Sequence, residues 1–352
     1  MIQATSPLRL FTGHQDDCSV PEFWTVRQAF EAMKLPEMKH KARSERTIAK
    51  WEKAIWYWEQ VTDNPPICRV TSDLLTDFPS RLLDPKRAFD VNTNTTANAN
   101  LMYIRGILRA CEEHLPRVPR AWPLPQQAAT RHRRVVPPEV LAEMHKACDV
   151  ARYDRHRCRS YCRSIPAPVL MRATLALFLS IGCRRTEGLT MDASAYRRQP
   201  EFPDFPEHPQ LEVDAESPHG WLVFHTPKTR ARKDGLPLVL PVSEVLAKHL
   251  NELDRLAPRR HRMLPLGDAP TTWANQLKRV QKAAGIENFY TWQDLRKTAN
   301  RMFRKAGGRE VAKFMLGHQP RGVNATWYDD LAEDAVIAVE RVQLPQCFQE
   351  VG

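Results

Sequence analysis

The sequence predicts a mostly helical α+β protein, with a helical N-terminal unit joined to a larger unit that contains a small β-sheet. Apolar residues recur at helical spacing along much of the chain, which indicates amphipathic helices. Two short apolar runs, 221–226 and 236–242, have the length and composition of strands. A proline-rich basic segment at 116–137 separates the two parts, and 352 residues suffice for two or three domains.

The N-terminal part divides into a polar, flexible arm at 1–20 and a helical unit at 21–115. Its first helical pattern consists of Phe23, Val26, Ala29, Phe30 and Met33. The second pattern, with lysines on the opposite face, consists of Ile48, Trp51, Ile55 and Trp58. The third consists of Leu101, Ile104, Ile107, Leu108 and Cys111. The sequence therefore predicts a small all-helical domain that ends near Leu115.

The segment 116–137 combines prolines with a basic cluster that contains Arg131, Arg133 and Arg134. Its prolines disfavour a packed helix and favour an extended connection that is semi-rigid at its start. Such a basic connection either tethers two globular units or helps them close around a rod-shaped ligand. Composition is compatible with both.

The second unit, predicted at 138–345 with a tail to 352, mixes helices and strands. The two strands flank a long hairpin tip rich in positive charge, PKTRARKDG. Helices are predicted at 139–151, 168–182, 243–253, 271–285, 293–307 and 309–317. Two of these helices are expected to end at the glycines Gly285 and Gly307.

The net charge of +11 favours a polyanionic partner, most simply nucleic acid, although many soluble proteins are mildly basic without a specific reason. The eight cysteines form no compact disulfide framework, which indicates reduced thiols in a cytosol-like compartment. The chain opens without a secretory signal, and its longest apolar stretch, 175–183, is too short to span a bilayer. We therefore expect a cytoplasmic protein.

Two positions place a cation on or beside a regular element. Arg184 follows an apolar helix directly, and Glu187 three residues later is positioned to orient it. Lys228 lies at the end of a predicted strand, where a lysine can donate a proton to a leaving oxygen. The hairpin tip adds Arg230, Arg232 and Lys233. The ordinary alternatives are a surface ion pair for the first position and a solvated basic turn for the second.

A third group lies near the C-terminus. Thr291 is a candidate N-cap, with Asp294 completing a capping box. Gln293 and Arg296 then share one face in the first turns of a helix whose N-terminus favours an anion. Further on, His318 follows the helix stop at Gly317, and Tyr328 follows ten residues later. An amphipathic helix and a packing aromatic are the ordinary readings.

The order of these motifs resembles the tyrosine recombinase family, also called phage integrases. The resemblance covers roughly 136–342 as catalytic domain, and more loosely 21–115, which is similar to the family's helical core-binding domain. It implies that Arg184 and Arg296 clamp a phosphate and that Lys228 protonates the 5′ leaving oxygen. It also implies that His318 hydrogen-bonds the scissile phosphate and that Tyr328 is the nucleophile.

The resemblance further implies that Glu187 supports Arg184. The sequence departs from the family pattern in two places. Gln293 stands where the family usually has His or Lys, so this side chain carries neither a proton nor a charge. The interval from His318 to Tyr328 is one residue longer than the commonest family spacing.

The family resemblance implies a site-specific recombinase or integrase that cleaves and rejoins double-stranded DNA through a 3′-phosphotyrosyl intermediate. It implies a C-shaped clamp, four protomers acting together, association with the nucleoid, and neither a metal nor a nucleotide cofactor. Backbone contacts are expected from the basic residues of the linker and the hairpin tip, namely Arg131, Arg133, Arg134, Arg230, Arg232 and Lys233.

Other interpretations stay open at this point. A topoisomerase of the same chemistry would nick and reseal one strand, Gln293 is compatible with a non-enzymatic DNA-binding relic, and a structural or interaction protein is a third alternative. The C-terminal segment either packs on its own domain or docks on a neighbouring protomer. The residues His145, Cys148, His156, Cys158 and Cys162 crowd one region, but their spacing matches no standard zinc finger. No metal site is predicted.

Overall fold

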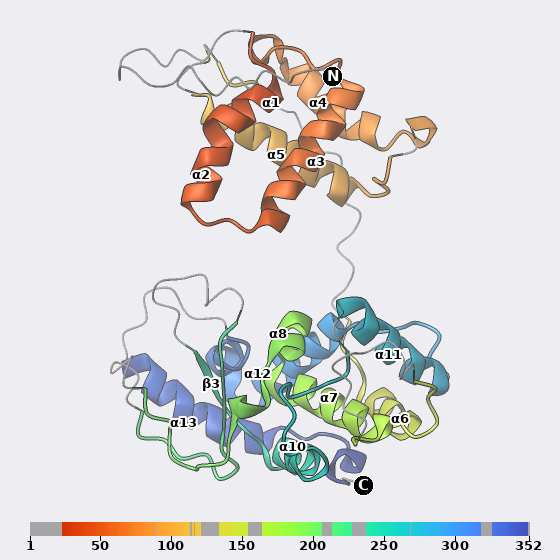
Figure 1. The fold of residues 1–352 in the computed structure, drawn as a ribbon, viewed down its shortest axis with the longest axis vertical. Coiled ribbons are helices and arrows are strands. Elements are labelled where there is room, and N and C mark those ends of the chain that lie inside the picture. The colour runs from red at the N-terminus through yellow and green to blue at the C-terminus, as the bar shows by residue number, and fades with distance from the viewer. Residues whose placement is uncertain are drawn as a thin grey trace. The chain divides into compact units, whose positions relative to one another are not determined.

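The computed structural model describes residues 23–87, 89–112, 115, 117–120, 134–153, 164–205, 213–226, 237–267, 269–317 and 326–350, with the backbone alone described at 326–329. The chain forms two compact units, Met1–Thr130 and Arg131–Gly352 (Figure 1). The predicted arm at 1–20 and most of the predicted linker lie outside the described residues.

The first unit is a small helical domain. Its helices are α1 (Val26–Ala29), α2 (Leu35–His40), α3 (Glu45–Val61), α4 (Ser72–Leu82) and α5 (Asn94–Ala110), and a π-helical turn at Phe30–Lys34 joins the first two. The face predicted for α3 is confirmed at Ile55 and Trp58, which are fully buried. The Trp58 ring lies 5.2 Å from that of Phe78 in α4. This packing closes the core of the domain.

Two details of the first unit correct the prediction. Phe23 is 73% exposed, because the first helix begins only after the N-cap Thr25. The helix α4 was not predicted, and it contains Pro79, a residue that usually interrupts a helical pattern. Thr71 caps α4 by accepting a hydrogen bond from the backbone N–H of Leu74 at 3.2 Å.

The second unit combines helices with one small sheet. Its helices are α6 (Pro138–Ala147), α7 (Ala167–Ile181), α8 (Arg185–Thr190), α10 (Glu244–Leu256), α11 (Pro270–Ala283), α12 (Trp292–Met315) and α13 (Thr326–Arg341). The strands β1 (Tyr196–Arg197), β2 (Trp221–Phe224) and β3 (Leu238–Pro241) pair antiparallel in the order β1-β2-β3. The predicted α+β class is confirmed, with strands shorter than expected. None of the described helices is long and apolar enough to cross a membrane.

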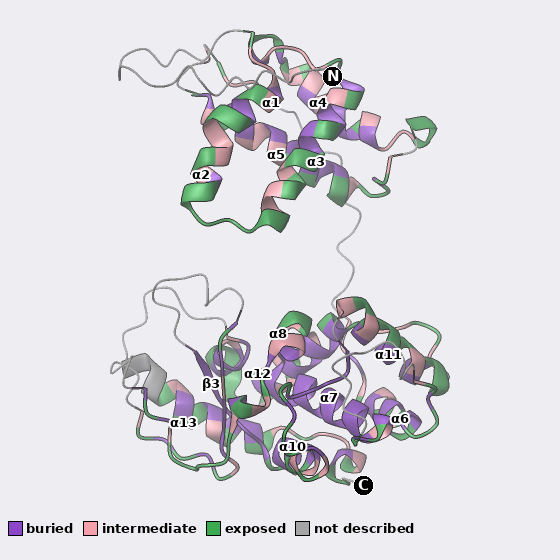
Figure 2. Ribbon diagram, viewed as in Figure 1, coloured by how far each residue is buried: buried purple, intermediate pink, exposed green. Residues whose placement is uncertain are grey.

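Helix α7 is the centre of the second unit. Nearly all of its side chains are buried, and Figure 2 shows it in the colour of buried residues. It packs against α10 and α12, and α12 in turn packs against α13. On α13 the residues Ala332, Ala335 and Val339 are buried in this domain, whereas Ile337 is 49% exposed. The C-terminal helix therefore packs on its own chain.

Glycines set the ends of two helical segments. Gly285 follows α11 with φ of 71°, which confirms the predicted stop. The predicted stop at Gly307 is wrong by one residue, because Gly308 has φ of 85° and kinks α12. Gly307 itself lies against α13, where an added Cβ would come within 2.8 Å of the Ala338 Cβ. The kink at Gly308 allows the second half of α12 to turn and continue as a helix.

Candidate active site

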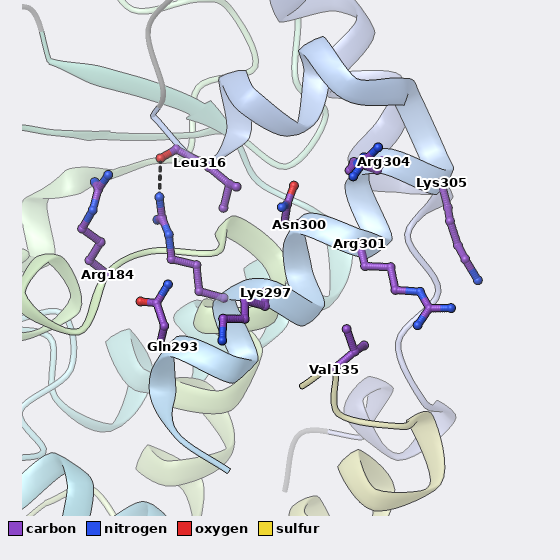
Figure 3. A pocket seen from close by; sticks show the side chains of 10 residues that line it. Val135, Arg184, Gln293, Lys297, Asn300, Arg301, Arg304, Lys305 and Leu316 are labelled. Carbon is purple, nitrogen blue, oxygen red and sulfur yellow. Dashed lines mark hydrogen bonds between the residues drawn. The ribbon is translucent and has the colours of Figure 1, made fainter. Parts of the chain in front are cut away.

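A cavity of about 740 Å³ lies beside the first half of α12 (Figure 3). Six of its ten lining residues are cationic: Arg184, Arg296, Lys297, Arg301, Arg304 and Lys305. The other four are Val135, Gln293, Asn300 and Leu316, so no carboxylate lines the cavity among the described residues. A hollow with this composition attracts an anion.

Arg184 reaches the cavity from the turn between α7 and α8. The turn is set by Gly182, which has φ of 58° and donates its N–H to the carbonyl oxygen of Phe178 at 3.0 Å. Glu187 then holds Arg184 twice. It accepts the backbone N–H at 2.6 Å through Oε2 and a guanidinium N–H at 2.5 Å through Oε1. Because the Glu187 side chain is almost fully buried, this pair fixes the guanidinium strongly.

Arg296 enters the same cavity from the first turn of α12. It is 5% exposed, and it donates hydrogen bonds to the carbonyl oxygens of Gly182 and Leu316. Its Nη1 also lies 3.8 Å from Oε2 of Glu187. Burial lowers the pKa of Arg296, with a further contribution from the charge of Arg184, but an arginine remains protonated under these conditions. One buried carboxylate therefore faces two guanidiniums, which leaves a net positive charge.

The predicted capping box at the start of α12 is confirmed. The Thr291 hydroxyl accepts the Asp294 N–H at 3.3 Å, while Asp294 Oδ2 accepts the Thr291 N–H at 2.9 Å. This cap fixes the first turn, from which exposed Gln293 and buried Arg296 both reach the cavity (Figure 3). Gln293, for which the family resemblance led us to expect His or Lys, is therefore a neutral amide on the cavity wall.

Several predicted site residues lie outside the described part of the chain. These are Lys228, His318, Arg131, Arg133, Arg230, Arg232 and Lys233. Tyr328 lies on α13, in the short stretch where only the backbone is described. Leu316, two residues before His318 in the sequence, lines the cavity.

Arg134 is engaged with its own domain. Its guanidinium lies over the ring of Tyr290, 4.2 Å from the centroid, and donates to the carbonyl oxygens of Asn288 and Phe289 at 2.6 and 2.9 Å. These contacts anchor the chain just before α6 beside the start of α12. The DNA contact of Arg134 stays a prediction, and its guanidinium is already fixed on the protein.

Sequence reasoning missed part of the cavity wall: Lys297, Asn300, Arg301, Arg304 and Lys305. Their spacing places them on one helix face, because residues three or four apart are neighbours on a helix surface. A different face of the same helix holds the buried residues Leu295, Ala299 and Phe303. The basic residues of this helix could therefore have been assigned to one surface.

For a metal, the described residues offer no group of three or more His, Cys, Asp or Glu side chains. Of the cysteine and histidine cluster considered above, His145 and Cys148 are buried, and His156, Cys158 and Cys162 lie outside the described residues.

No protein-family model matches the sequence. No curated protein gives a significant match either. Solved structures do match. A lambda integrase tetramer bound to a Holliday junction aligns with a TM-score of 0.58 and 14% identity, over 89% of this chain and 84% of that one. The Tn1549 transposon integrase in complex with transposon right end DNA aligns with a TM-score of 0.58 and 12% identity, over 88% and 94%.

A third structure, the XerH site-specific recombinase bound to its difH substrate, aligns with a TM-score of 0.51 and 12% identity, over 84% of this chain and 79% of that one. The chain has the tyrosine recombinase fold. At these identities the likeness establishes the fold alone. The fold implied by the order of the sequence motifs is confirmed.

Proposed function

We propose that this protein is a site-specific DNA recombinase that cleaves and rejoins strands through a 3′-phosphotyrosyl intermediate. The observation that carries the proposal is the pairing of Arg184 and Arg296 on one cavity wall, with Glu187 between them. Arg184 comes from the turn between α7 and α8, whereas Arg296 comes from α12, and both are fixed by buried partners before any ligand binds. Preorganised cations of this kind stabilise the charge that develops on a phosphate during displacement.

In the proposed reaction, the Tyr328 oxygen attacks a DNA phosphorus atom. A phosphorus–oxygen bond forms to the tyrosine, and the bond to the 5′ oxygen breaks. The phenol releases its proton to solvent water, and Lys228 delivers one proton to the departing 5′ oxygen. Attack by a 5′-hydroxyl on the phosphotyrosine reverses these steps. The ester retains the energy of the broken bond, so the cycle consumes no nucleotide.

Arg184 and Arg296 hold the two non-bridging oxygens throughout this cycle. Their role is electrostatic, because a guanidinium remains charged and offers two parallel N–H donors to a phosphate. The loss of one such donor typically raises a barrier by about 2.7–4 kcal/mol. We expect His318 to supply a further hydrogen bond to the same phosphate.

The proposal extends to assembly and location. The lambda integrase structure is a tetramer on a Holliday junction, and we propose a tetramer of this chain on double-stranded DNA. A recombinase that acts on chromosomal DNA would be found at the nucleoid.

Gln293 favours a second candidate function, a DNA-binding protein that has lost its catalysis. The neutral amide lines the cavity where a charged or proton-carrying side chain would assist the reaction. Such a protein would bind DNA and form no covalent adduct.

The deciding experiment traps the adduct on a library of nicked duplexes, in which the cleaved fragment diffuses away and religation is blocked. We expect wild-type protein to form a covalent complex, and Tyr328→Phe to form none while binding DNA normally. The matched control is Tyr290→Phe, which removes a hydroxyl from a tyrosine packed under Arg134 and should keep the adduct.

An adduct that survives in Tyr328→Phe would assign the nucleophile to another residue. DNA binding without an adduct from wild type would favour the catalytically inactive protein. Relaxation of supercoiled DNA without recombination between two marked sites would favour a topoisomerase-like enzyme that nicks and reseals one strand.

A further inference from the structure

A line of cations runs along α12 away from the Arg184–Arg296 pair. Lys297, Arg301 and Lys305 follow Gln293 at intervals of four residues, so they lie along one face of the helix. All four residues line the cavity described above, and Figure 3 shows Arg301 and Lys305 beyond Lys297 on the side away from Arg184. We call Lys297, Arg301 and Lys305 the basic row.

The charge of the basic row is largely unneutralised. Within the described residues, Arg301 and Lys305 form no ion pair, and Lys297 has one partner, Asp294, with Nζ and Oδ1 3.3 Å apart. Lys313, further along the same helix, instead pairs with Glu310 at 2.7 Å. Repulsion between neighbouring cations at this spacing destabilises a helix. A row with only one carboxylate partner among the described residues, Asp294, is therefore suited to an external anion.

Part of the basic row also borders a second cavity, most of whose lining residues are apolar. Arg301 and Lys305 line this cavity of about 710 Å³, where Arg341 from the end of α13 joins them. No carboxylate lines this second cavity among the described residues either. Two adjoining hollows thus share cations from α12, and an extended polyanion fits this arrangement better than a single small anion does.

We propose that the basic row binds the phosphodiester backbone of duplex DNA outside the phosphate held by Arg184 and Arg296. This inference rests on the proposed function for the position of that phosphate. Four helical residues advance about 6 Å, so the row spans about 12 Å along the helix axis. Phosphates of one strand advance about 3.4 Å along the duplex axis, so a row of this length laid along a strand would face several of them. It fixes the register of the DNA and reads no sequence.

The test measures how the affinity of the full chain for a short duplex falls with salt, by fluorescence anisotropy. The slope of log K against log salt concentration is negative, and each lost phosphate contact reduces its magnitude by about 0.9. The double variant Arg301→Ala/Lys305→Ala is therefore expected to reduce this magnitude by about 1.8. Both side chains are exposed, so the domain should fold, which a thermal melt verifies.

Two controls accompany this variant. Lys313→Ala removes the same charge from the same helix, where Glu310 already neutralises it, and should leave the slope unchanged. Arg301→Lys keeps the charge and should also retain the slope. A slope for the double variant that matches Lys313→Ala would overturn the proposal. A changed oligomeric state with an unchanged slope would also overturn it, because the row would then be a protein contact.

The result of the salt-dependence measurement can be distinguished from the result that tests the proposed function. The adduct assay on nicked DNA, at low salt and saturating protein, reports cleavage in the same variants. A reduced slope in a protein that never forms an adduct would support the basic row and reject the recombinase. An adduct together with an unchanged slope would reject the row alone.

Discussion

The guanidinium of Arg296 donates a hydrogen bond to the carbonyl oxygen of Leu316 at 2.9 Å, which ties the first turn of α12 to the residue that ends the same helix. The same guanidinium donates to the carbonyl oxygen of Gly182 at the end of α7. One buried cation therefore joins three chain segments at the cavity. The contacts that position the candidate phosphate clamp also contribute to the stability of the domain.

Gly182→Ala is expected to destabilise the second unit by about 2–5 kcal/mol, from two additive causes. Its φ of 58° strains any residue with a Cβ by about 1–2 kcal/mol. The new Cβ would also lie 2.5 Å from Cδ2 of Leu316, and overpacking of this kind costs about 1–3 kcal/mol. Urea unfolding measures the change in the free energy of unfolding.

Gly285→Ala is the matched control for this prediction. Gly285 has φ of 71°, yet nothing lies within 4 Å of an added Cβ. The control carries the backbone strain without the clash, so we expect a loss of about 1–2 kcal/mol. Equal losses for the two variants would show that the chain around Leu316 relaxes and that the close approach is not required.

Arg184→Ala is expected to slow adduct formation through the loss of about 2.7–4 kcal/mol of transition-state stabilisation. The Arg184 side chain is 31% exposed, and its partner Glu187 keeps the nearby Arg296. Single-turnover rates on nicked DNA measure the effect. Arg185→Ala, an exposed neighbour outside the cavity, should cleave like wild type. Cleavage by Arg184→Ala at the wild-type rate would contradict the clamp.

Gln293→His is expected to accelerate adduct formation by at least about tenfold, because it places a group that can carry a proton on the cavity wall. A histidine also adds a pH dependence near its ordinary pKa of about 6.5. The rate of the variant should then depend on pH in this range more steeply than the wild-type rate does. The control Gln293→Asn keeps an amide and should not accelerate cleavage. An unaltered rate in Gln293→His would mean that another residue already supplies this function.

Local sequence rules predicted the parts of the structure that depend on local chemistry. The face of α3, the capping box of Thr291 and the stop at Gly285 follow from the spacing and type of neighbouring residues. The choice between Gly307 and Gly308 did not follow, because the kink depends on how closely α13 approaches. Tertiary packing decides such details.

The candidate site likewise combines residues that the sequence identifies with features that only tertiary packing determines. Arg184, Arg296 and Glu187 were identified by motif order, but their common cavity requires α7 and α12 to pack side by side. The near-complete burial of Arg296 also arises from tertiary contacts, since Gly182 is distant in sequence. The basic row was overlooked for another reason: its spacing was visible in the sequence, but basic residues on an amphipathic helix usually form a solvated face.

The last prediction concerns two buried histidines beside the C-terminal segment. The His145 ring lies 4.5 Å from that of Phe348 and 6.3 Å from that of His249, measured between centroids. Burial, with a smaller contribution from the charge of Arg172, lowers the pKa of both histidines to about 4. Both are therefore neutral in the folded protein, while unfolded histidine has a pKa of about 6.5.

The stability that these neutral rings contribute is fully present above about pH 6.5. It is lost progressively as the pH falls from there through the folded pKa of about 4. Each histidine should cost about 2 kcal/mol of unfolding free energy between pH 7 and pH 5. His145→Leu should remove one such contribution without a large loss at neutral pH, because Nε2 of His145 has no hydrogen-bond partner among the described residues. Urea unfolding at a series of pH values tests this, with His261→Leu at an exposed position as the control. If His145→Leu keeps the wild-type pH dependence, the ring is already charged in the fold and the packing against Phe348 does not exclude the proton.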